Sequence, residues 1–146
     1  MKKIWETMNE EETFAVGKTL GENAKKGQVF ALNGDLGVGK TVLTKGFAKG
    51  LAIEEHITSP TFAIMQIYEG RLPLYHFDVY RLSYEEELED IGYEEYFYGE
   101  GVTLVEWANK FKELMPKDII QITIEKSLEK GLDYRIITLE NHQEEV

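Results

Sequence analysis

Residues 34–41 have the sequence Gly34-Asp35-Leu36-Gly37-Val38-Gly39-Lys40-Thr41. This segment matches the phosphate-binding pattern G-x-x-x-x-G-K-[ST]. Glycines allow backbone conformations that are closed to other residues, so successive N–H groups can turn inward and form a nest for an anion. We expect Lys40 to reach the β and γ phosphates of a nucleotide and the Thr41 hydroxyl to bind magnesium. All the residues of the segment are therefore candidate nucleotide-binding residues.

The flanking segments predict a strand, a loop and a helix in that order. The apolar run Gln28-Val29-Phe30-Ala31-Leu32 precedes the loop and predicts a buried strand. Residues 40–51 follow it and carry apolar side chains at helical spacing: Val42, Leu43, Phe47 and Leu51. The positive end of the helix dipole would point at the phosphates. A glycine turn beside a helix is the alternative, and this context disfavours it.

The rest of the chain mixes strands with helices. We expect strands at 3–7, 61–68, 72–78, 102–107, 119–125 and 134–139, and helices at 10–25, 83–91 and 109–114, with Asn9 and Ser83 as N-caps. Two of the strand pairs predict hairpins, which makes an all-parallel sheet unexpected. The fold class is α/β: a single P-loop nucleotide-binding domain over residues 1–146, with a mixed β-sheet flanked by helices. The tail, 140–146, is expected to fray.

The amino-acid composition excludes several classes of protein and of chemical site. A chain of 146 residues fits one domain, and the absence of cysteine excludes disulfides, thiolate metal sites and a cysteine nucleophile. There is no run of 18 apolar residues, so no transmembrane helix is expected. The first residues lack the apolar core of a secretory signal. These features predict a cytoplasmic protein with no membrane partner.

The net charge of -11 is concentrated in the later part of the chain. Residues 85–100 contain eight acids and no base. Phosphate contacts dominate nucleic-acid binding, so a chain this acidic is a poor nucleic-acid binder by itself. The acidic stretch is either a solvated helix face or a docking surface for a basic partner.

Two acids follow apolar runs and are candidates for the metal and for hydrolysis. Asp78 follows Leu74-Tyr75-His76-Phe77, and Glu106 follows Val102-Thr103-Leu104-Val105. A P-loop nucleotidase needs an acid at the end of a strand to hold magnesium, directly or through water. One acid would ligate the metal while the other orients water, and the residues alone do not assign these roles.

Two further positions are candidates for the site. The segment Thr58-Ser59-Pro60-Thr61-Phe62 lies where P-loop proteins often place a loop that senses the γ-phosphate, and an ordinary turn is the alternative. Within it, Thr61 is a candidate nucleotide-binding residue. His76 should share a strand face with Asp78, and we expect it to be a core or hydrogen-bonding histidine.

The missing motifs favour ATP as the nucleotide. A GTPase normally carries [NT]-K-x-D for guanine, whereas Asn109-Lys110-Phe111-Lys112 lacks the acid. Small-molecule kinases usually need several arginines to clamp two phosphorylated substrates, and the chain has three: Arg71, Arg81 and Arg135. A metabolite kinase and a nucleotide-dependent interaction module stay open as alternatives.

With these motifs together, the chain resembles the TsaE family, the small bacterial ATPases required for threonylcarbamoyl modification of adenosine in tRNA. The likeness covers about residues 9–139. Besides the phosphate loop, the matching strings are Ser59-Pro60-Thr61-Phe62, His76-Phe77-Asp78-Val79-Tyr80-Arg81 and Leu104-Val105-Glu106-Trp107. The loop alone would be generic, whereas the combination of S-P-T-F with H-F-D-x-Y-R is specific.

The resemblance implies a role that composition could not supply. The protein would be a magnesium-dependent ATPase that works with the TsaB and TsaD proteins and meets tRNA only indirectly, through that complex. The catalytic residues would be Lys40, Asp78 and Glu106, with Thr41 and Glu106 holding Mg²⁺ and Asp78 needed for hydrolysis. The adenine of ATP would lie near the start of the first helix, at about residues 10–13.

Overall fold

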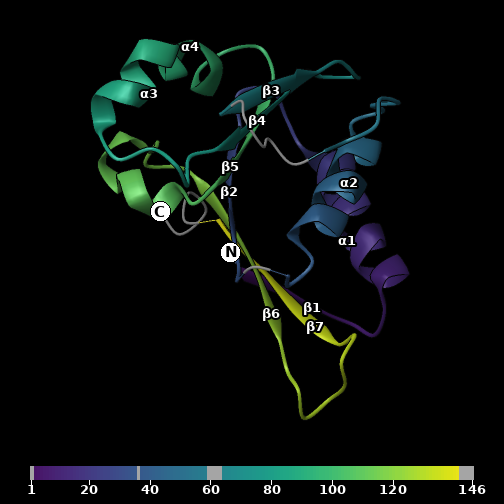
Figure 1. The fold of residues 1–146 in the computed structure, drawn as a ribbon. Coiled ribbons are helices and arrows are strands. Elements are labelled where there is room, and N and C mark those ends of the chain that lie inside the picture. The colour runs from purple at the N-terminus through teal and green to yellow at the C-terminus, as the bar shows by residue number, and fades with distance from the viewer. Residues whose placement is uncertain (1, 36, 59–63, 142–146) are drawn as a thin grey trace.

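A twisted β-sheet runs through the middle of the molecule and has helices on both faces (Figure 1). The computed structural model describes residues 2–35, 37–58 and 64–141. Within that part of the chain the sheet has seven strands in the order β1-β7-β6-β2-β5-β4-β3. The strands β6, β2, β5 and β4 are parallel, while β1, β7 and β3 pair antiparallel with their neighbours. The predicted α/β class with a mixed sheet is confirmed.

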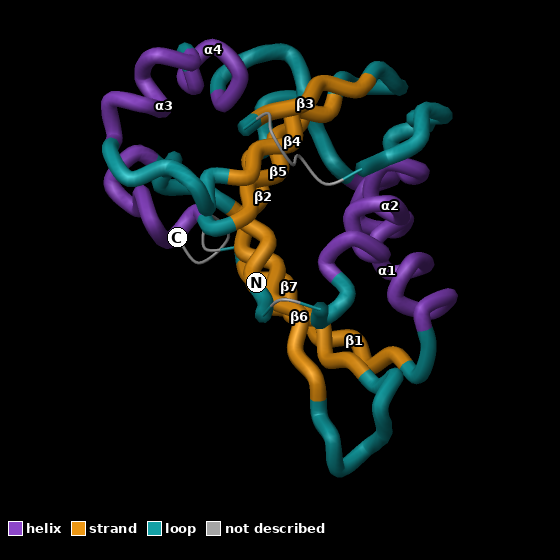
Figure 2. Tube along the Cα trace, in the orientation of Figure 1, coloured by secondary structure: helices purple, strands orange, loops and turns teal. Residues whose placement is uncertain are grey.

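Helices and strands are intermixed along the chain (Figure 2). The strands are β1 (Lys2–Thr7), β2 (Val29–Asn33), β3 (Met65–Tyr68), β4 (Leu74–Asp78), β5 (Val102–Glu106), β6 (Ile120–Lys126) and β7 (Arg135–Glu140). The helices are α1 (Glu10–Asn23), α2 (Lys40–Gly50), α3 (Glu85–Ile91), α4 (Tyr93–Phe97) and the 3₁₀ helix η1 (Ala108–Leu114). Both predicted hairpins, β3–β4 and β6–β7, are present.

One face of the sheet is covered by α1 and α2, which pack against each other at backbone distance. A Cβ atom added to Gly21 would lie 2.1 Å from the Phe47 carbonyl oxygen, and one added to Gly46 would lie 2.1 Å from the Phe14 oxygen. Gly17 and Gly50 are as restricted, at 2.3 and 2.2 Å from backbone oxygens. Only glycine permits this approach, so the four glycines fix the separation of the two helices.

The opposite face is covered by α3, α4 and η1, and its contacts are made by side chains. Phe97 is 1% exposed, and its ring centroid lies 5.4 Å from that of Phe77 and 5.1 Å from that of Tyr93. Tyr96 contacts Phe77 and Tyr75 in the same edge-to-face manner. Aromatic pairs at these distances favour edge-to-face geometry, so interlocking rings hold these short helices to the sheet.

One predicted helix start differs from the structure, and another agrees with it. The helix predicted over residues 83–91 begins at Glu85 with Tyr84 as its N-cap, whereas we expected Ser83 there. The cause is Glu87, whose carboxylate accepts hydrogen bonds from the backbone N–H groups of both Ser83 and Tyr84, at 2.9 and 3.0 Å. The predicted N-cap Asn9 is confirmed, because its side chain accepts a hydrogen bond from the N–H of Glu12 at 2.9 Å.

In the described ranges no helix is both long and apolar enough to cross a membrane.

Candidate nucleotide-binding site

The glycine loop connects β2 to α2, as predicted. Gly37 and Gly39 have φ values of +75° and +110°, in the left-handed region that strongly favours glycine. Gly34 packs so closely on β6 that an added Cβ atom would lie 2.8 Å from the Ile124 carbonyl oxygen. The helix α2 begins at Lys40, directly after the loop, and therefore presents its N-terminal N–H groups to this edge of the sheet.

Lys40 turns back from α2 toward the end of β5. Its side chain is almost buried, and its Nζ lies 3.7 Å from Glu106 Oε1. The same Nζ lies 4.8 Å from the centroid of the Trp107 ring, a cation–π contact. Lys40 and Glu106, which are far apart in the sequence, are thereby brought to one point beside the glycine loop.

His76 completes a chain of charged and polar groups at this point. It is 2% exposed, and its Nε2 lies 2.8 Å from Glu106 Oε2. Each oxygen of the Glu106 carboxylate therefore has its own nitrogen partner. The other ring nitrogen, His76 Nδ1, has no hydrogen-bond partner among the described residues. The predicted hydrogen-bonding histidine is found, and its bond fixes the orientation of the carboxylate.

The period-two alternation of strands places these groups on the face that α2 covers. Leu74, His76 and Asp78 alternate with Tyr75 and Phe77, which pack on the opposite face. Asp78 is directly opposite Glu106 in the register of β4 and β5. The carboxyl ends of parallel strands share an edge of the sheet, so the two predicted acids meet there.

The two acids differ in their protonation behaviour. Burial raises the pKa of Asp78, and the charge of Glu106 adds to the rise against the opposing effect of the Tyr80 N–H hydrogen bond. Burial would also raise the pKa of Glu106, but the His76 hydrogen bond and charge together with Lys40 outweigh it and lower that pKa. Glu106 is therefore a firmly ionised carboxylate, whereas Asp78 takes up a proton more readily than an ordinary aspartate.

The segment after Glu106 has an unusual backbone. Trp107 has φ +65°, which few residues other than glycine adopt and which costs on the order of 1 kcal/mol. Its ring lies 4.9 Å from that of Tyr80, and Lys110 Nζ donates to the Tyr80 carbonyl. These contacts join the residues that follow Asp78 to those that follow Glu106. Trp107 contacts both Lys40, which follows the glycine loop, and Tyr80, which follows β4. Its ring therefore packs between the glycine loop and the ends of β4 and β5.

Two hollows flank the loop. The larger has a volume of about 530 Å³ and lies between the loop and β6; it is lined by Gly34, Asp35, Val38, Thr123, Ile124, Glu125 and Lys126. The smaller, about 80 Å³, is lined by Gly37, Val38, Gly39, Val42, Asp133, Arg135 and two residues of α1, Glu10 and Thr13. The second hollow brings the start of α1 beside the loop, where the resemblance places the adenine.

Not every predicted site residue can be located. Leu36 and Thr61, together with the rest of 59–63, lie outside the described residues. Thr41 is exposed in the first turn of α2. Sequence reasoning assigned no role to Arg135, whose Nε donates to the carbonyl of Val38 within the loop at 2.6 Å. No local pattern marks it, because its partner is distant in the sequence.

Residues 7–135 match the family model described as threonylcarbamoyl adenosine biosynthesis protein TsaE. The chain belongs to the TsaE family. A protein of Bacillus subtilis named tRNA threonylcarbamoyladenosine biosynthesis protein TsaE is 51% identical over 94% of this chain and 85% of its own length. A protein of the same name from Treponema pallidum is 43% identical over 78% of this chain and 84% of its own length.

A solved structure has the same fold. The crystal structure of Bacillus subtilis YdiB covers 97% of this chain and 86% of its own, with a TM-score of 0.79 and 45% sequence identity. The resemblance inferred from the motifs is therefore confirmed at the level of family and of fold.

Proposed function

We propose that this chain binds ATP at the glycine loop, hydrolyses it to ADP and phosphate, and thereby serves tRNA threonylcarbamoyladenosine biosynthesis. Membership of the TsaE family supports the biological role, since the relatives carry that role in their names. The chemistry is supported by the loop itself and by the charged groups that gather beside it.

The observation that carries the proposal is the contact of Lys40 with Glu106 and of Glu106 with His76, at 3.7 and 2.8 Å. A buried lysine beside a phosphate-binding loop supplies a positive charge where the phosphates would lie. A buried glutamate at the end of the adjacent strand supplies the acid that such a site requires. Two partners hold the glutamate in place, so it is oriented before any substrate arrives.

The donor set fits magnesium. Mg²⁺ prefers oxygen ligands, and it is usually held by one or two protein oxygens together with phosphate oxygens. The Thr41 hydroxyl and the ionised Glu106 carboxylate are the groups we assign to it, on the strength of the resemblance and of the low pKa of Glu106. When bound, the metal would offset the negative charge that develops on the phosphates.

Asp78 is the group we assign to the attacking water. It lies beside Glu106 in the sheet and is half-buried, and its raised pKa suits a residue that orients water and accepts its proton. The adenine is assigned to the smaller hollow, between the loop and residues 10–13. The absence of the guanine motif supports ATP over GTP.

The partners are part of the proposal. The resemblance implies that TsaB and TsaD form a complex with this chain in the cytoplasm, and that tRNA meets the complex and not this acidic chain alone. TsaD would carry out the threonylcarbamoyl transfer, so ATP hydrolysis here would reset or drive the complex between turnovers.

The test is an ATP turnover assay with Mg²⁺, on the chain alone and with purified TsaB and TsaD. Asp78→Asn and Glu106→Gln each remove a charge while keeping the shape, and each should lower turnover at least tenfold, about 1.4 kcal/mol in the barrier. Glu86→Gln is the matched control, because this exposed acid lies in α3 on the other face of the sheet. We expect it to leave the turnover of the chain alone unchanged.

The outcomes separate the proposal from its alternatives. Wild-type turnover that is stimulated by TsaB and TsaD supports it. Normal turnover in both acid variants would overturn the site assignment. Phosphate transfer to a small metabolite in place of water would favour the kinase, and partner binding that depends on ATP without turnover would favour the interaction module.

A further inference from the structure

Arg135, the first residue of β7, connects the β6–β7 hairpin to the glycine loop. Its guanidinium makes three hydrogen bonds to backbone carbonyls: Nε donates to Val38 at 2.6 Å, and Nη1 donates to Leu132 and Tyr134 at 2.7 and 2.8 Å. Arg135 is half-buried and lines the smaller hollow together with Gly39. A planar guanidinium loses little freedom when it donates several hydrogen bonds at once, so this contact is rigid.

The bond to Val38 determines the direction of the next N–H group. Every peptide bond in the described part of the chain is trans, and in a trans peptide the carbonyl and the following N–H point in opposite directions. Because the Val38 carbonyl points at Arg135, the Gly39 N–H must point away from it. Gly39, which follows this peptide, has a φ of +110° and no side chain, so on its side no side-chain barrier restricts the peptide plane.

The loop needs such an external support. Glycines give a phosphate loop its shape, but they also leave it many alternative conformations. An anion nest binds strongly only when its N–H groups are already oriented, since otherwise the binding energy is reduced by the cost of ordering them. Arg135 supplies that order from outside the loop, and the carbonyls of Leu132 and Tyr134 hold Arg135 itself.

We propose that Arg135 is a positioning residue for the phosphate-binding loop: by fixing the Val38 carbonyl, it pre-orients the Gly39 N–H toward the phosphates. The assignment rests on the proposed function in so far as the loop binds ATP. It also makes the β6–β7 hairpin a support of the site, because the hairpin carries the arginine.

Two variants of Arg135 and one control test the proposal by calorimetric titration with Mg-ATP. Arg135→Gln should weaken ATP binding at least tenfold. Arg135→Lys keeps the positive charge but lacks the planar guanidinium. The logarithm of its ATP affinity should therefore lie less than halfway from that of Arg135→Gln to that of the wild type. Lys130→Ala is the matched control: it removes a cation from the same hairpin, where Lys130 contacts Tyr134 and not the loop, and should leave affinity unchanged.

A second readout reports on the loop without any nucleotide. In ¹⁵N-glycine-labelled protein, the Gly39 amide resonance should move in Arg135→Gln and Arg135→Lys and stay in place in Lys130→Ala. The proposal is overturned if the Gly39 resonance is unmoved in both arginine variants. It is also overturned if Arg135→Lys restores full affinity, which would indicate a role of charge alone, or if Lys130→Ala weakens binding as much as Arg135→Gln. Failure of the wild type to bind ATP would count against the proposed function and leave the resonance test of Arg135 standing.

Discussion

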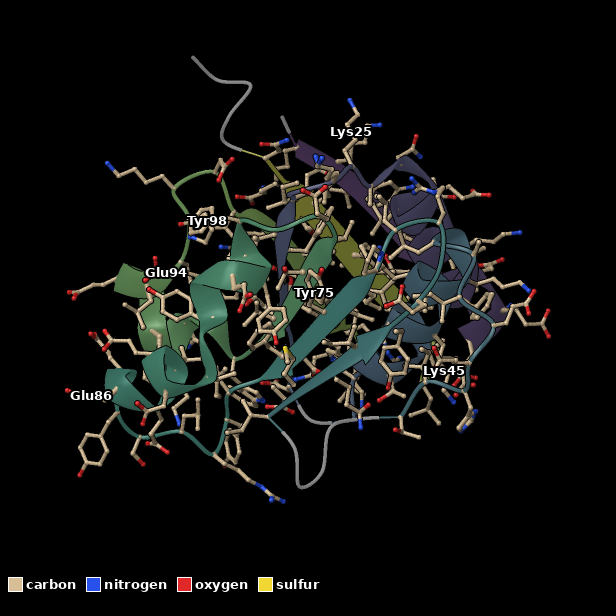
Figure 3. All side chains as sticks on the ribbon, turned by 90° about the horizontal axis from the view of Figure 1, so that it is seen from above. Lys25, Lys45, Tyr75, Glu86, Glu94 and Tyr98 are labelled. Carbon is tan, nitrogen blue, oxygen red and sulfur yellow. The ribbon has the colours of Figure 1, made fainter. Side chains whose placement is uncertain are left out.

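The two faces of the sheet are held together in different ways and carry different groups. On the face of α1 and α2, glycines bring backbones into direct contact, and the candidate site lies at the edge of that layer. On the face of α3 and α4, aromatic rings interlock beneath an acidic surface. Figure 3 shows Glu86, Glu94 and Tyr98 on this side and Lys45 on the other.

This difference in packing indicates that the two faces of the sheet have different roles. Backbone contact leaves few alternative arrangements, so α1 and α2 hold the loop and the start of α1 in a fixed relation. Side-chain contact tolerates changes in sequence at the surface, and the exposed Tyr84 and Tyr98 lie among the acids on that face. We therefore expect changes on the α3–α4 face to alter stability while ATP affinity is kept.

The largest expected change in stability is that of Phe97→Ala. Removing a buried aromatic side chain costs about 3–5 kcal/mol of unfolding free energy. Urea denaturation would measure the loss, and Phe97→Leu, which keeps most of the volume, should lose roughly 1 kcal/mol. ATP affinity per folded molecule should be unchanged in Phe97→Leu. A tenfold loss of ATP affinity in Phe97→Leu would contradict the proposal that the two faces have different roles.

Gly46→Ala should come next, at about 1–3 kcal/mol of unfolding free energy, because the added methyl group would overlap the Phe14 carbonyl oxygen. The helices must separate to admit it, and since α2 begins at Lys40 we expect ATP affinity to fall as well. Lys45→Ala, an exposed change on the same helix, should stay within about 0.5 kcal/mol and keep affinity. Equal stability of the two variants would show that the glycine contact is dispensable.

Asp78→Asn should raise stability slightly at neutral pH while it lowers turnover. Because the folded protein raises the pKa of Asp78, the stabilising contribution of its protonated form is complete below the ordinary aspartate pKa and is lost as pH rises through the raised value. Asparagine does not ionise, so the variant should gain over wild type as pH increases across that window. Thermal melts of both proteins at acid and at neutral pH measure this difference in stability. A gain for Asp78→Asn that is larger at acid pH than at neutral pH would contradict a raised pKa of Asp78.

The smallest change in ATP affinity is expected for a triple variant on α3, which combines Glu85→Gln, Glu86→Gln and Glu89→Gln. These acids lie on α3, across the sheet from the loop, so ATP affinity should not change. Glu87 is left intact because it accepts hydrogen bonds at the start of α3, which also lower its pKa. If the acids form a docking surface, association with TsaB and TsaD should slow and lose part of its salt dependence. If the association rate with TsaB and TsaD is unchanged at every salt concentration, these acids form only a solvated helix face.

Much of the site was predictable from local patterns. The loop, the strand before it and the helix after it each carry a signal within a few residues. The period-two alternation in β4 was enough to place His76 and Asp78 on one face. Both hairpins and the two strands that end in acids followed from apolar runs and turn residues.

The remaining features depend on contacts between distant segments. α4 was not predicted, since its five residues are held by the aromatic cluster and not by a strong helical pattern. The glycine spacing Gly17–Gly21 and Gly46–Gly50 was visible in the sequence, but its meaning required two helices to face each other. The pairing of Lys40 with Glu106 and of Arg135 with Val38 likewise exists only once the sheet is assembled.

We expect Lys40 to bind the phosphates of ATP at a site on the α1–α2 side of the sheet. Calorimetric titration of Lys40→Ala with Mg-ATP, beside Lys45→Ala as the matched lysine of the same helix, tests it most directly. We predict at least a tenfold loss of ATP affinity for Lys40→Ala, a wild-type affinity for Lys45→Ala, and circular dichroism spectra that match the wild type for both. Equal ATP affinity in the two variants would contradict the claim.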